Sequence, residues 1–183
     1  GVNDVVQALQ FTDPGILAVG GVFSFAGAPW SSGAIGAGGL AFFQATCPAL
    51  AWSISTTCAG SSGQIKLACT ASPWVGSTFA SSAAGLAPNA LAASVVGLTS
   101  PGSSLSLYSP FAGPGCFLLA SAEAVSLLTP SGVGTTSYSF AIPNNGAFAA
   151  VELYHQVLQL EGGTSQGILL SSSNGLHLTI GTF

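Results

Sequence analysis

Charged side chains are nearly absent from this sequence. They make up 3% of its 183 residues, whereas about 25% is usual for soluble proteins. Lys66 is the single cation, and five carboxylates leave a formal net charge of −4. Nucleic-acid binding needs several cations to neutralise phosphates, so we expect no nucleic-acid partner. A net charge this small does not steer ligands over a distance either.

Long apolar runs and strong helix signals are also missing. Prolines and glycines break the uncharged tract between Asp13 and Lys66, and no run of roughly 18 apolar residues remains to form a membrane-spanning helix. Gly85 and Pro88 interrupt the alanine-rich residues 83–96. Residues 121–128 have room for one helical turn. We therefore expect no membrane span and under about a tenth helix, compared with about a third in typical domains.

The motifs of common catalytic and metal sites are missing too. There is no Cys-x-x-Cys and no Cys/His cluster to bind zinc. No Gly-x-Ser-x-Gly elbow falls on a strand–helix turn. Glu152 and Glu161 are expected on one strand, roughly 30 Å apart, which is too far for a glycosidase pair. His155 and His177 lack a third metal ligand. We expect no enzyme activity, metal site or cofactor.

What the sequence does contain is a series of short apolar segments, separated about every 8–12 residues by Gly, Pro, Asn and Ser. This spacing predicts an all-β protein, an antiparallel β-sandwich of Ig-like or jelly-roll-like type. A Gly-Gly bend is expected within 16–26. The expected strands are 4–11, 16–26, 34–46, 52–55, 64–69, 77–84, 90–98, 104–108, 116–120, 135–142, 150–160, 167–171 and 175–181.

Alternation along the last strands assigns side chains to faces. In 175–181, Leu176, Leu178 and Ile180 share one face, and His177 points away from it. In 152–160 the shared face carries Tyr154, Gln156, Leu158 and Leu160, with Glu152 at its rim.

A set of ordered motifs covers residues 57–181, about two thirds of the chain. This tract resembles a secreted Gly/Ala/Ser-rich β-sandwich domain of planctomycete-type environmental bacteria, and the resemblance implies a secreted sandwich rather than an activity. The motifs are Cys-Ala-Gly-Ser at 58–61, Pro-Trp-Val-Gly-Ser-Thr-Phe at 73–79, Pro-Asn-Ala at 88–90, Pro-Gly-Cys-Phe-Leu at 114–118, Ile-Pro-Asn at 142–144, Tyr-His-Gln-Val-Leu-Gln-Leu at 154–160 and Ser-Asn-Gly-Leu-His-Leu-Thr-Ile-Gly at 173–181.

The resemblance divides the chain and suggests how its cysteines pair. Residues 1–56 fall outside it as an N-terminal β extension, strand-exchanging or packed on the sandwich domain of 57–183. Four cysteines allow three connectivities. Cys58 and Cys116 match cysteines of the family pattern, while Cys47 and Cys69 are additional. We therefore expect Cys58–Cys116 and Cys47–Cys69 disulfides, each contributing about 2–4 kcal/mol to stability.

The expected compartment is extracellular or the cell surface. The number of cysteines is even, which favours an oxidising environment. The chain begins at Gly1 and has no methionine, as a form processed by signal-peptide removal would.

Two function classes fit these features. The first is a structural protein that assembles with copies of itself into a filament or surface layer, because six charged residues provide little repulsion between copies. The second is a secreted carbohydrate-binding or adhesion module, in which Trp30, Trp52 or Trp74 could stack on sugar rings, although burial of these side chains is the commoner role.

The N-terminal segment is the expected assembly strand. It could add to a neighbour's sheet, or complete its own subunit's sandwich. Its apolar residues are Val2, Val5, Val6, Leu9 and Phe11.

Overall fold

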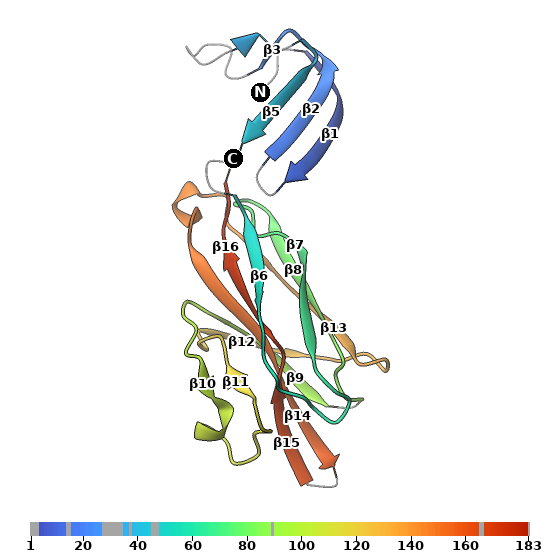
Figure 1. Ribbon diagram of the computed structural model, residues 1–183, viewed down its shortest axis with the longest axis vertical. Helices are drawn as coiled ribbons and strands as arrows, with labels where there is room; N and C mark the ends of the chain where they lie inside the picture. The colour runs from blue at the N-terminus through green and yellow to red at the C-terminus, as the bar shows by residue number, and fades with distance from the viewer. Residues whose placement is uncertain are drawn as a thin grey trace. The chain divides into compact units, whose positions relative to one another are not determined.

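The computed structural model describes residues 4–13, 16–26, 35–36, 38–44, 48–88, 90–164 and 167–182. Within these ranges the protein is all-β, which confirms the expected fold class (Figure 1). The helical elements there are two three-residue 3₁₀ turns, η1 (Leu105–Leu107) and η2 (Gly146–Phe148). The chain divides into a smaller unit, Gly1–Ala49 with Gly181–Phe183, and a larger unit, Leu50–Ile180.

The smaller unit contains a three-stranded antiparallel sheet of order β1-β2-β5, formed by Val5–Asp13, Ile16–Val22 and Leu40–Gln44. A short pair, β3 (Phe25–Ala26) and β4 (Ile35–Gly36), accompanies it. A bulge in β1 between Val6 and Ala8 lies opposite Gly20 and Gly21. A Cβ at Gly21 would collide with the carbonyl of Val5, so the expected Gly-Gly irregularity lets the two backbones approach closely.

The larger unit is a sandwich of two antiparallel sheets. One has the order β12-β9-β14-β16-β6, with β15 also paired to β14, and the other has the order β13-β8-β7. The strands are β6 (Leu50–Ile54), β7 (Lys66–Ala71), β8 (Thr78–Ala84), β9 (Leu91–Gly97), β12 (Ala124–Leu128), β13 (Thr135–Ala141), β14 (Glu152–Thr164), β15 (Gly167–Ser172) and β16 (Gly175–Thr179).

The main core lies between these two sheets. Phe79 from β8 and Leu178 from β16 are fully buried there, and Val157 from β14 packs in the same cluster. Leu176 and Ile180 join Leu178 in this core, which confirms the face predicted for residues 175–181. Burial of this alternating apolar face is the main force that holds the two sheets together.

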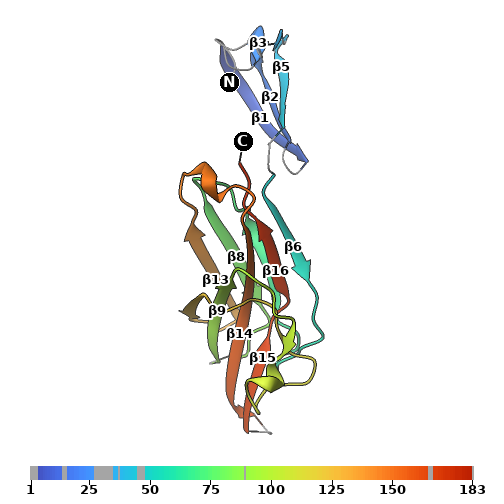
Figure 2. The same ribbon diagram turned by 90° about the vertical axis from the view of Figure 1, so that its left-hand side faces the viewer.

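The long strand β14 organises the six-stranded sheet (Figures 1 and 2). One edge of β14 pairs with β9 from Tyr154 to Leu160. Its other edge pairs first with β16, through Glu152 to His155, and then with β15, from Leu158 onward. Two successive strands thus share one edge of β14.

A segment of residues 99–120, called here the cover segment, packs against the outer face of this sheet. It contains β10 (Ser103–Ser104), η1 and β11 (Phe117–Leu118). It also runs beside β15, because the amide of Gly113 donates to the carbonyl of Leu170 (2.9 Å) and the amide of Leu170 donates to the carbonyl of Phe111 (2.7 Å).

Several sequence expectations differ from the structure. The expected single strands 16–26 and 34–46 are each divided, into β2 and β3 and into β4 and β5. The division between units falls at Leu50 rather than after residue 56, because β6 pairs with β16 in the large sheet. Residues 124–128 form strand β12 instead of a helical turn, because they pair with β9 as the edge strand of the sheet. Residues 104–108 hold the 3₁₀ turn η1 rather than a strand.

Candidate functional sites

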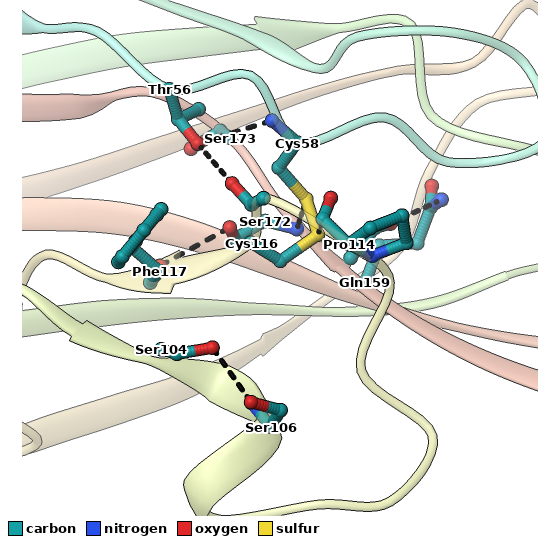
Figure 3. Close-up of a disulfide and its surroundings, with 12 residues drawn as sticks. Thr56, Cys58, Ser104, Ser106, Pro114, Cys116, Phe117, Gln159, Ser172 and Ser173 are labelled. Atoms are coloured by element: carbon teal, nitrogen blue, oxygen red, sulfur yellow. Dashed lines mark hydrogen bonds between the residues drawn. A yellow bond between two sulfur atoms is a disulfide. The ribbon is translucent and has the colours of Figure 1, made fainter.

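The disulfide between Cys58 and Cys116 fixes the cover segment to the sandwich (Figure 3). Both cysteines are fully buried, and the amide of Ser172 on β15 donates to Sγ of Cys58 (3.0 Å). The Thr56 hydroxyl donates to the carbonyl of Gly115 (3.0 Å) beside the bond. The first of the two expected disulfides is therefore confirmed.

Gln156 holds the same segment over the centre of the outer face. Its Oε1 accepts the amide of Leu119 (2.9 Å), and its Nε2 donates to the carbonyls of Phe117 and Ser173 (both 2.9 Å). A buried amide side chain needs this complete pairing, since each lost partner would cost about 1–3 kcal/mol. Gln156 is a structural anchor. Alternation groups it on one face with Tyr154 and Leu158, but no local pattern connects it to residues 117–119.

Cys69 on β7 has a free thiol that donates to the carbonyl of Ala71 (3.4 Å). Partial burial raises the pKa of this thiol, and the hydrogen bond to Ala71 opposes that effect. Cys47 lies outside the described residues, so this second pairing stays a prediction.

His155 occupies a closed polar site between the two sheets. Its Nε2 lies 2.9 Å from Oγ of Ser81, and its Nδ1 lies 3.2 Å from the carbonyl of Val95 and 3.4 Å from Oγ of Ser94. Burial lowers the pKa of His155 to about 4, although the bond to Val95 opposes this. Ser81 and His155 resemble a nucleophile and its base, but both are buried, so a substrate cannot reach them here.

Glu161 and Gln159, both on β14, are buried and bind two neighbouring loops. Glu161 is buried, and its Oε1 accepts the amide of Ser61 (3.1 Å) and the side-chain amide of Gln159 (2.5 Å). Oε1 of Gln159 accepts the amide of Ala87 (2.7 Å). Glu161 therefore fixes the loop that contains Ser61.

On the outer face, beyond the cover segment, aromatic rings form a row across three neighbouring strands. Tyr154 on β14 lies opposite His177 on β16, which lies opposite Trp52 on β6. The rings of Tyr154 and His177 stack with centroids 4.6 Å apart and planes 8° apart. Nε1 of Trp52 donates to Nδ1 of His177 (2.7 Å), and Nε2 of His177 lies 3.4 Å from Oε2 of Glu152. We call these four residues the aromatic row.

Alternation in the sequence points His177 away from the apolar face of its strand and groups Tyr154 with Gln156 and Leu158, but it does not decide which face of residues 152–160 is outward. The contact with Trp52 needs the pairing of β6 with β16, residues 125 positions apart, and no local pattern reveals such a pairing. His155 and His177, on paired strands, point to opposite sides of the sheet and form no common site.

The expected assembly strand is present as β1, paired with β2 of its own chain. Val5, Val6 and Leu9 are exposed, as is every other residue from Asp4 to Gln10. Val2 and the side chain of Phe11 lie outside what the structure describes. Because β1 is the edge strand of its sheet, it presents one backbone edge that no described strand of the chain pairs with.

No family model, curated protein sequence or solved structure matches this chain. The resemblance to planctomycete-type secreted domains stays a prediction from the motifs. In the described ranges, no three His, Cys, Asp or Glu side chains gather to hold a metal. Those ranges also contain no helix with the length and hydropathy that crossing a membrane requires.

Proposed function

We propose that this is an extracellular structural protein that assembles with copies of itself into a filament or surface layer. The observation that carries the proposal is the exposed apolar strand β1. Its residues from Val5 to Gln10 are all exposed, Val5 at 58% and Leu9 at 63%. An apolar edge strand with little charge is a ready template for pairing with another chain.

The larger unit offers a matching edge. Strand β12 ends the six-stranded sheet, pairs only with β9 among the described strands, and contains no charged residue. Val125 is 57% exposed and Leu127 is 85% exposed. Natural edge strands usually carry lysine, proline or an inward charge that prevents such pairing, and β12 carries none of these.

Strand addition from β1 of one copy to β12 of the next would join two different surfaces. Such a head-to-tail contact propagates into a fibre unless its rotation closes a ring. Backbone hydrogen bonds would supply affinity, and alternate side chains such as Val125 and Leu127 would set the register. In this arrangement β1 keeps its pairing with β2 and uses its second edge.

Sedimentation velocity over a range of protein concentrations tests the proposal. We expect species much larger than the 17.9 kDa chain, with a distribution that shifts upward as concentration rises. A single 17.9 kDa species that persists at the highest soluble concentration would contradict assembly.

A further inference from the structure

We propose that the aromatic row is a binding site for a neutral oligosaccharide. The site comprises Trp52, Tyr154, His177 and Glu152, and the inference does not depend on the assembly proposed above.

Trp52 is the ring of the row that is most open to solvent. Trp52 is 48% exposed, and it lies on β6, the edge strand, so no further described strand stands beyond it. Tryptophan and tyrosine are enriched at binding interfaces, because a partner can cover the large apolar ring while the N–H or O–H keeps a hydrogen-bond partner. A sugar ring presents a flat face of C–H groups that packs well against such a ring.

The rings are held in place before any ligand arrives. The Trp52 indole donates to Nδ1 of His177 (2.7 Å). The Tyr154 ring stacks on the imidazole of His177, with the ring centroids 4.6 Å apart. Since Nδ1 accepts this hydrogen bond, the proton of the neutral imidazole lies on Nε2, facing Glu152. His177 is thus a positioning residue, and a preorganised surface avoids part of the entropy cost of binding.

Glu152 supplies the polar part of the site. Its side chain is 57% exposed, and its Oε2 lies 3.4 Å from Nε2 of His177, too far for a strong hydrogen bond. Nε2 itself is shielded from water and has no hydrogen-bond partner among the described residues. The carboxylate therefore keeps acceptor capacity for ligand hydroxyl groups.

Charge and geometry narrow the ligand class. An anion is disfavoured, because Glu152 is negative and the only cation of the chain, Lys66, lies on β7 in the opposite sheet. A quaternary ammonium ion needs rings around it on several sides, but Tyr154 and His177 stack on each other and leave no space between them. Three strands span about 10 Å, so the row suits a short oligosaccharide better than one sugar ring.

Isothermal titration calorimetry with cellohexaose, xylohexaose and chitohexaose tests this site. We expect the wild-type chain to bind at least one of these probes. Trp52→Ala should weaken that binding by at least about tenfold, which corresponds to about 1.4 kcal/mol. Trp52→Phe, which keeps a ring but loses the bond to His177, should be intermediate and serves as a variant that preserves the fold.

Phe111→Ala is the matched control, because Phe111 is also 48% exposed and lies on the cover segment. Its affinity for the probe should equal that of the wild type. The inference is overturned if none of the three probes binds, if Trp52→Ala binds as tightly as the wild type, or if tetramethylammonium binds in a Trp52-dependent manner and the saccharides do not.

Discussion

His155 makes the stability of the protein sensitive to pH. Burial lowers the pKa of His155 to about 4 in the folded protein, against about 6.5 in an unfolded chain. Phe79 and Tyr138 contribute rings to its surroundings, with centroids 6.1 and 5.3 Å away. Between about pH 6.5 and 4, His155 is protonated in the unfolded chain but stays neutral in the folded protein.

We expect the contribution of neutral His155 to the free energy of unfolding to be complete above about pH 6.5. The free energy of unfolding should then fall by up to about 3 kcal/mol as the pH drops to 4. Urea denaturation at a series of pH values measures this. His155→Gln removes the titration, so the difference between the two curves isolates it from the carboxylates. Parallel curves for the variant and the wild type across this window would show that His155 does not cause the dependence.

The Cys58–Cys116 bond closes a loop with a sequence separation of 58. Constraint of the unfolded chain by a loop of this length is worth up to about 4 kcal/mol. The double variant Cys58→Ser, Cys116→Ser should therefore lower the free energy of unfolding by about 2–4 kcal/mol in urea denaturation. A loss below about 0.5 kcal/mol, the usual range for neutral surface changes, would mean that the hydrogen bonds from Gln156 and β15 hold the cover segment without help from the disulfide.

Peptide mapping without reduction checks the pairing itself. A crosslinked peptide pair containing Cys58 and Cys116 is expected, and the sequence also predicts one containing Cys47 and Cys69. Detection of a Cys47–Cys58 peptide pair would be incompatible with both.

Individual side chains differ in how far the sequence could foresee their roles. The core positions Leu176 and Leu178 follow from strict alternation, which depends only on local strand geometry. The roles of Gln156 and Glu161 do not, because their partners lie at residues 117–119 and 61 in distant loops. Nothing local distinguishes a buried, satisfied carboxylate from an exposed one.

At the level of elements, β12 provides the sharpest test of an assembly edge. Leu127→Lys places a charge on this edge at a side chain that is 85% exposed. The change should leave the free energy of unfolding within about 0.5 kcal/mol and shift sedimentation toward the monomer.

Val133→Lys is the matched control, because Val133 is 84% exposed but lies in the turn before β13. We expect this variant to assemble like the wild type. Equal assembly of the Leu127 and Val133 variants would exclude β12 as the receiving edge.

The strands themselves were largely predictable, whereas their partners were not. Segments 77–84 and 135–142 correspond to β8 and β13, which pair along their whole length. The strand β12 was missed, because five residues without charge carry too little periodicity to separate a strand from a helical turn. Its identity comes from pairing with β9, about 30 positions away, which is a tertiary effect.

On the scale of the whole molecule, few charged residues are combined with sheet edges that carry no protecting charge. Six charged residues in 183 leave little electrostatic repulsion between copies, so exposed apolar strands are not kept apart. The disulfide and the closed core stabilise each subunit. In the assembly proposed above, β1 and β12 are the edges that join the copies.

Negative-stain electron microscopy of the wild-type chain, beside a chain that lacks residues 1–10, tests this claim most directly. We predict filaments or sheets for the wild type. The truncated chain should remain as folded single particles and should bind an added peptide of residues 1–12. Dispersed monomers in the wild-type sample, or native filaments formed by the truncated chain, would contradict assembly through β1.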